Sequence, residues 1–196
     1  NGASRIVRLS SRRRLGFGSI FLLQGWMEKG WRGLPFRPIS EHYKNLFGEK
    51  VYKIPVSVAE DCPNRQGLRG MQTCIFCDEW GSAAFAEAKE MALADQISTF
   101  KERIGKRYKA RKFLVYFQAY TNTFLKLSKL KENFDIAMKD PQVVGFVVGT
   151  RPDCLSKGVL DLWQEVNKTH KVFIEIGVQS FNESTLTFFR RGHSAA

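Results

Sequence analysis

Three cysteines lie close together in the sequence, with the spacing Cys62-x11-Cys74-x2-Cys77. Thiolates are the ligands that iron–sulfur clusters require. Three thiolates on a four-iron cube leave one iron with an open coordination position, which a catalytic metal centre needs. Cys74 and Cys77 could hold two corners of a cube from one tight turn, while Cys62 reaches a third across a longer loop. Gly67 and Gly70 give that loop the freedom to wrap around a bulky group.

The same cysteines leave two other interpretations open. One is a zinc site, although structural zinc usually takes four protein ligands and the fourth cysteine, Cys154, lies far along the chain. The other is a set of unconnected buried thiols. A disulfide framework is typical of small secreted proteins, and this chain is neither small nor obviously secreted. The spacing therefore favours the iron–sulfur cluster over zinc.

Alternating strands and helices must position these cysteines. The apolar pattern predicts strands at 51–58, 113–117, 143–148 and 172–176, and helices at 87–108, at 124–139, from an N-cap at Ser156 to about Lys168, and from near Glu183. Pro55 suggests that the first strand lies at a sheet edge or begins late. Strict alternation implies parallel strands with right-handed crossovers, so the fold class is α/β, either a (β/α) barrel or a doubly wound sheet.

A polar or glycine-containing loop follows each predicted strand. These loops are the cysteine loop after the first strand, then residues 118–123, 149–153 and 177–180. Both candidate folds place their chemistry at the carboxyl ends of the strands. We therefore expect the four loops to converge on one edge of the sheet.

Composition and charge place few limits on function. The formal net charge is +12, and five of the arginines lie within residues 1–26, which contain no Asp or Glu. We expect residues 1–35 to form a basic, disordered extension and residues 36–196 to form the folded core. Our hypothesis is that Met27 is the natural start and that a translated upstream region or an expression artefact precedes it. No apolar run is long enough to span a bilayer, so we expect a cytoplasmic protein without a membrane partner.

Several motifs together resemble the radical S-adenosylmethionine superfamily, and more narrowly its YhcC-type members, which are related to the catalytic subunit of elongator. The matching motifs are the segments CPNR at 62–65, CIFC at 74–77, YFQAYTNT at 116–123, GTRPDCL at 149–155, EIGVQS at 175–180 and RGH at 191–193. They fall within about residues 40–194. The resemblance implies a partial (β/α) barrel of radical S-adenosylmethionine type with a [4Fe–4S] cluster on Cys62, Cys74 and Cys77. It also implies S-adenosylmethionine as cofactor and an electron donor of flavodoxin or ferredoxin type.

Four further residues are candidates for binding S-adenosylmethionine. By similarity to the oxygen-independent coproporphyrinogen oxidases, Gln179 and Arg191 match residues that hold the cofactor. Arg151 and Glu175 stand where opposite charges on the cofactor could be met. Both have a structural alternative, because Arg151 could cap the loop after its strand and Glu175 could form a buried ion pair. Cys154 belongs to the GTRPDCL motif, and we interpret it as a buried thiol.

The sequence departs from the family pattern at two places. Family members usually have glycine just before the second cysteine, where this chain has Gln72 and Thr73. The later strands and the glycine-rich cofactor loop of the family are also missing. We therefore expect either a fragment or a truncated gene product that lacks the C-terminal strands.

Three functions remain in competition. The first is a radical S-adenosylmethionine enzyme of unknown substrate, which forms a 5′-deoxyadenosyl radical. The second is an RNA-directed version that modifies tRNA, suggested by the basic run at 106–112, although such a run is more often a solvated helix end. The third is a non-enzymatic zinc-binding module.

Overall fold

The computed structural model describes residues 36–84, 88 and 90–195. The expected disordered extension at 1–35 and the suspected start at Met27 lie outside the described residues. The chain divides into two compact units, residues 1–42 and 43–196. In the described part of the chain, no helix has the length and apolar character needed to cross a membrane.

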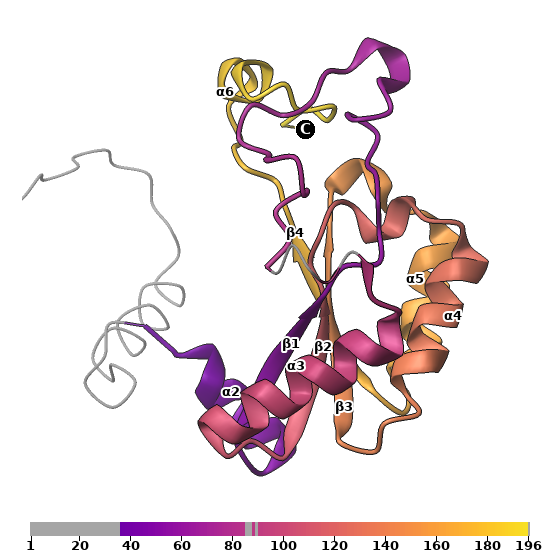
Figure 1. The fold of residues 1–196 in the computed structure, drawn as a ribbon. Helices are drawn as coiled ribbons and strands as arrows, with labels where there is room; N and C mark the ends of the chain where they lie inside the picture. Colours follow the sequence, from indigo (N-terminus) through magenta and orange to yellow (C-terminus); the bar gives the residue numbers. More distant parts are fainter. Residues whose placement is uncertain (1–35, 85–87, 89, 196) are drawn as a thin grey trace, which may run out of the picture. The chain divides into compact units, whose positions relative to one another are not determined.

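The second unit contains four strands that alternate with helices (Figure 1). The strands are β1 (Val51–Val56), β2 (Lys112–Phe117), β3 (Val143–Thr150) and β4 (Lys171–Ile176). The helices that follow them are α3 (Leu93–Tyr108), α4 (Leu127–Ala137), α5 (Lys157–Val166) and α6 (Glu183–Phe188). A further helix, α2 (Ile39–Phe47), precedes β1, and short 3-10 turns lie at Leu68–Gly70, Asn122–Phe124 and Pro152–Cys154.

All three strand pairs are parallel, and the strands follow one another across the sheet in the order β1-β2-β3-β4. The predicted α/β class with parallel strands is confirmed. Pro55 lies in β1, which is an edge strand, as the sequence suggested. Proline is tolerated there because an edge strand does not need every backbone N–H for pairing.

One face of the sheet carries the main core. Phe117 of β2 and Phe146 of β3 both pack against Phe134 of α4, with ring centroids 5.4 and 4.7 Å apart. The same cluster includes Phe100 of α3 and Trp163 of α5. The three crossover helices therefore cover the same face, because their apolar stripes share one core.

The opposite face of the sheet is concave. It carries a smaller apolar cluster that includes Tyr43 and Leu114, with Phe173 of β4 packed against Tyr43 at 5.1 Å. Lys53 of β1 also reaches Glu175 of β4 on this face, with an Nζ–Oε1 distance of 2.5 Å. Three strand spacings of a flat sheet would separate β1 from β4 by roughly 14 Å. Two side chains standing perpendicular to a flat sheet would not meet across that width, so the sheet curves toward this face.

Element boundaries differ from the predictions at several ends. The helix predicted to begin at 87 begins at Leu93, because Ala92 has extended backbone angles as its N-cap. The buried side chain of Gln96 holds this junction, since its amide bonds the backbone N–H and C=O of Ser57 and the C=O of Met91. The helix predicted from 124 begins at Leu127, after a 3-10 turn. Ser156 caps α5 as predicted, accepting a hydrogen bond from the N–H of Val159 at 3.3 Å.

Candidate metal centre

The loops after the four strands meet at the carboxyl edge of the sheet, as predicted. Gln118, directly after β2, donates from Nε2 to the carbonyl of Ser82 in the cysteine loop at 3.0 Å. The hydroxyl of Thr123 contacts that of Thr150 at the end of β3. The contacts join the cysteine loop, the loop after β2 and the end of β3, so residues far apart in sequence face a common region.

A turn at each end shapes the cysteine loop. After Cys62 the chain makes a helix-like turn, in which the N–H of Gln66 bonds the carbonyl of Cys62 at 3.1 Å. Gly67 and Gly70 both have positive φ angles, 64° and 75°, which glycine adopts without strain. At the other end the N–H of Cys77 bonds the carbonyl of Cys74 at 3.1 Å, closing a tight turn. Cys74 and Cys77 therefore share one turn, as their spacing predicted.

The three thiols interact electrostatically. Cys74 is buried, with 4% of its surface exposed, while Cys62 and Cys77 are half-buried. A hydrogen bond from the Cys77 thiol, helped by the Arg191 guanidinium, lowers the pKa of Cys74 to about 5. The same hydrogen bond raises the pKa of Cys77, and burial and the charge of Cys62 add to that rise. The hydrogen bond and the guanidinium both favour the thiolate form of Cys74, the form that binds metal.

The arrangement of these thiols does not match a single-ion site. Within residues 36–84, 88 and 90–195, no three His, Cys, Asp or Glu side chains are grouped closely enough to hold one metal ion. A four-iron cube takes each thiolate on a separate iron, so its ligands lie further apart than those of a single ion. The donor set, three thiols from one loop, suits such a cube, because each thiolate can bind a separate iron.

Arg191 provides positive charge beside the cysteines. Its Nη1 lies 3.5 Å from the sulfur of Cys74, and its Nη2 donates to the carbonyl of Gly177 at 2.7 Å. Gln179 also approaches this glycine, and its backbone has a positive φ of 72°. A Cβ on Gly177 would lie 3.0 Å from Nε2 of Gln179 and 3.9 Å from Nη2 of Arg191. The structure therefore brings Gln179, Arg191 and Cys74 to the same edge of the sheet.

Arg151 is held by protein partners. It is 5% exposed, and its guanidinium makes two parallel hydrogen bonds to Asp153, at 2.8 and 2.7 Å, and a third to Oδ1 of Asn64. Although burial opposes charge on both partners, their pairing raises the pKa of Arg151 and lowers that of Asp153. Arg151 thus joins the loop after β3 to the cysteine loop.

Glu175 lies on the concave face, also with protein partners. Besides Lys53, it accepts a hydrogen bond from the hydroxyl of Tyr116 at 2.6 Å. Partial burial opposes the charge of Glu175, but the hydrogen bonds from Lys53 and Tyr116 lower its pKa overall. Burial and the hydrogen bond to Glu175 raise the pKa of Tyr116. The side chain of Glu175 is 45% exposed, so the ion pair is not the buried one considered from the sequence.

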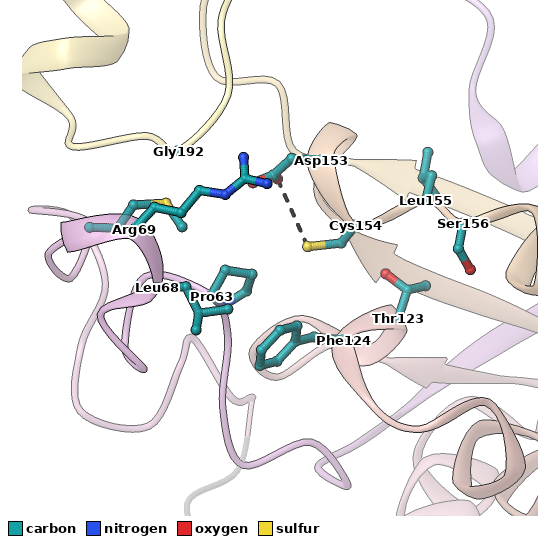
Figure 2. Close-up of a pocket in the computed structure, with 11 residues that line it drawn as sticks. Pro63, Leu68, Arg69, Thr123, Phe124, Asp153, Cys154, Leu155, Ser156 and Gly192 are labelled. Carbon is teal, nitrogen blue, oxygen red and sulfur yellow. Dashed lines mark hydrogen bonds between the residues drawn. The ribbon is translucent and has the colours of Figure 1, made fainter.

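A cavity of about 390 Å³ lies between the cysteine loop and the loops after β2 and β3 (Figure 2). Pro63 and Phe124 line it from two of these loops, and Asp153 and Cys154 from the third. The Cys154 thiol lies 3.9 Å from Oδ1 of Asp153. Burial, together with the charge of Asp153, raises the pKa of Cys154 to about 11, so this thiol stays protonated near neutral pH. Cys154 is half-buried rather than fully buried.

Sequence reasoning missed Asn64, Asp153, Lys53 and Tyr116. Asn64 and Asp153 lie inside the motifs at 62–65 and 149–155, so they were visible as motif members without any assigned role. Tyr116 opens the motif at 116–123, and Lys53 is a charged position in an otherwise uncharged strand. Their shared face could have been derived from the strand alternation, but their meeting with Glu175 depends on sheet curvature.

Comparisons with known proteins give relatives without an assigned activity. The chain is 35% identical over 158 residues to the uncharacterized protein YtqA of Bacillus subtilis, covering 81% of this chain and 49% of that protein. It is 36% identical over 168 residues to an uncharacterized protein of Methanocaldococcus jannaschii, covering 84% and 50%. It is 35% identical over 153 residues to the protein YhcC of Escherichia coli, covering 76% and 48%. The chain thus spans about half the length of the curated relatives it matches.

No protein-family model matches the chain. Among solved structures, the archaeal Elp3 of Methanocaldococcus infernus with an N-terminal deletion aligns with a TM-score of 0.48 and 17% identity. That alignment covers 74% of this chain and 32% of the other.

Proposed function

We propose that the chain is part of a radical S-adenosylmethionine enzyme with a [4Fe–4S] cluster on Cys62, Cys74 and Cys77. The observation that carries the proposal is the position of these cysteines. They lie on the loop after β1, at the carboxyl edge of a parallel sheet, where the loops of the neighbouring strands converge. The motifs at 116–123, 149–155 and 175–180 support it, because they lie at the ends of β2, β3 and β4 and the turns that follow.

We further propose that the sheet is part of a (β/α) barrel. A doubly wound sheet reverses its strand order and carries helices on both faces. Here the order β1-β2-β3-β4 has no reversal, and the crossover helices share one face. The curvature toward the opposite face, where Lys53 meets Glu175, is the curvature that closing a barrel requires.

The residues around the cysteines fit an anionic cluster. Three thiolates bound to iron–sulfur leave a net negative charge, and Arg191 lies 3.5 Å from one of the sulfurs. The positive charges of Arg191 and Arg151 both act on Cys74 and stabilise its ionised form. When bound, the cluster would pass one electron from a flavodoxin or ferredoxin type donor to S-adenosylmethionine. Cleavage of that cofactor would then yield a 5′-deoxyadenosyl radical.

Four residues were predicted to contact S-adenosylmethionine, and two of them keep that role in our proposal. The side chains of Gln179 and Arg191 both approach Gly177, directly after β4, and amide and guanidinium groups there can bind a carboxylate or a ribose hydroxyl. Arg151 and Glu175 already have partners of opposite charge, Asp153 and Lys53. A direct contact with the cofactor would have to compete with those pairs, so we propose that both mainly hold the protein scaffold.

Metal analysis of variants tests this function. The chain, purified without oxygen and reconstituted with iron and sulfide, should be brown and hold iron rather than zinc. Cys74→Ser should abolish iron binding, whereas Cys154→Ser, the matched control, should leave it unchanged. Full-length protein with S-adenosylmethionine and a reductant should release 5′-deoxyadenosine. A colourless zinc protein would favour the zinc module, and an intact cluster that releases no 5′-deoxyadenosine would refute the enzyme.

The basic run at 106–112 gives the RNA-directed version no added support. Lys106 pairs with Glu102 at 2.5 Å, and Glu49 pairs with Arg111 at 3.1 Å and with Lys112 at 3.6 Å. Two acidic neighbours, Glu102 and Glu49, therefore offset part of this charge. Phosphate binding would predict an affinity that falls steeply with salt concentration, and we do not adopt this function.

A further inference from the structure

The cysteine loop is closed by a buried side chain that is not itself a ligand. Asn64 lies two residues after Cys62 and is 1% exposed. Its Nδ2 donates to the carbonyl of Gln72 at 2.6 Å and to the carbonyl of Arg190 at 2.5 Å. Its Oδ1 accepts a hydrogen bond from Nη1 of Arg151. One amide thus contacts three segments of the chain.

The position of each partner relates Asn64 to the cysteines. Gln72 is two residues before Cys74, so the bond to its carbonyl ties the two flanks of the loop together. Arg190 precedes Arg191, whose guanidinium lies beside the Cys74 sulfur, and the carbonyl of Arg190 lies 3.8 Å from that sulfur.

The chemistry of the site selects an amide at this position. Two backbone carbonyls require donors, and a guanidinium requires an acceptor. A carboxylate of the same shape would still accept from Arg151, but it would remove the amide donor from both carbonyls and leave that of Arg190 only its long contact with the Cys74 sulfur. A buried carbonyl that loses its partner favours a loop conformation in which water can reach it.

We propose that Asn64 is the positioning residue that closes the cysteine loop and keeps Cys74 within reach of Cys62 for a shared cluster. The inference deepens the proposed function, because it assigns a residue to assembly of the same site. Its first consequence, the closed conformation around Cys74, holds in the metal-free chain. It can therefore be tested without a loaded cluster.

The test measures the reactivity of each thiol in the metal-free chain. Wild type, Asn64→Asp and the control Gln66→Glu are treated with N-ethylmaleimide, and mass spectrometry gives the alkylation rate at each cysteine. Gln66 is exposed in the same loop, so its variant makes the same amide-to-carboxylate change without a buried partner. We expect Cys74 to react about tenfold faster in Asn64→Asp, because losing the donor of a buried bond shifts local opening by that order.

The direction of the effect separates loop opening from simple electrostatics. An added negative charge raises the pKa of a nearby thiol and would by itself slow the reaction of Cys74. Unchanged or slower alkylation of Cys74 in Asn64→Asp would overturn the proposal. Equal acceleration at Cys154 would overturn it as well, because Asn64 would then support the whole fold rather than the loop.

Reconstitution with iron and sulfide then separates this inference from the proposed function. We expect Asn64→Asp to hold at most about half the iron of Gln66→Glu, since a loop that opens more often binds its cluster less tightly. Equal iron in both variants would contradict the assembly role. If even the wild-type chain binds no iron while Cys74 is still faster in Asn64→Asp, the cluster proposal fails and the loop-closing role stands.

Discussion

Replacing Asp153 by Asn removes the charge that neutralises Arg151 and keeps the side chain's shape. The side chain of Arg151 is 6% exposed, and that of Asp153 is 24% exposed. Removing one partner of a fully buried ion pair costs about 3–5 kcal/mol, whereas exposed pairs contribute about 0.2–1 kcal/mol. The amide oxygen of the new asparagine can still accept one of the two hydrogen bonds. We therefore expect Asp153→Asn to lower the free energy of unfolding by about 2–3 kcal/mol.

The reverse variant should cost less. In Arg151→Met the carboxylate of Asp153 remains, and as the more exposed partner it can turn toward water. The Oδ1 of Asn64 loses the hydrogen bond that it accepts from Arg151. We expect about 1–2 kcal/mol of destabilisation. Asp161→Asn is the control, because Asp161 pairs with Lys157 at 2.6 Å on the surface, with side chains 57% and 87% exposed. Its cost should stay below about 0.5 kcal/mol.

Urea unfolding followed by circular dichroism measures the three variants against wild type. A comparison at equal m-values ensures that the midpoints report stability rather than a change in the unfolded state. The order Asp153→Asn, then Arg151→Met, then Asp161→Asn is the result we expect. A cost of Asp153→Asn as small as that of the surface control would refute the reasoning, because the guanidinium would then be solvated despite its burial.

Two further predictions concern the sheet. A Cβ on Gly145 would lie 2.3 Å from the backbone oxygen of Lys171, so Gly145→Ala should force β3 and β4 apart and cost about 1–3 kcal/mol. Its control, Gly105→Ala in α3, meets only ordinary contacts and should be neutral or stabilising in thermal melts. The ion pair with Lys53 helps to lower the pKa of Glu175 below its usual 4.5. Such a carboxylate stabilises the fold above the unfolded-state pKa and loses this contribution as the pH falls through the folded-state value. On acidification below about pH 4.5, wild type should therefore lose more stability than Lys53→Met, by less than about 1 kcal/mol. Urea unfolding across that pH range measures the difference. If Lys53→Met and wild type lose equal stability on acidification, the ion pair between Lys53 and Glu175 contributes nothing.

The fold was predictable where its signal is local. Continuous apolar runs identified β2 and β3, because strands covered on both faces exclude polar residues. The hydroxyl of Ser156 marked the start of α5, since an N-cap satisfies a free N–H of the first turn. The start of α3 was not predictable, because it depends on Gln96 bonding Ser57 across 39 residues of chain. Helix α2 was not predicted, although Tyr43 and Phe47 have helical spacing.

The candidate site shows the same difference between features that local sequence predicts and features that depend on distant residues. Residue type and spacing are local properties, so the sequence alone could assign Cys74 and Cys77 to one turn. The polar side chains around these cysteines are selected by partners far along the chain, as Asn64 is by Arg151 at a separation of 87 residues. No periodicity encodes such a pair, because either residue in isolation is only a polar group in a loop. A buried network of this kind becomes visible only when its donors and acceptors are counted in three dimensions. The residues it adds are therefore those whose substitution should change how the cysteine loop closes without removing a cysteine.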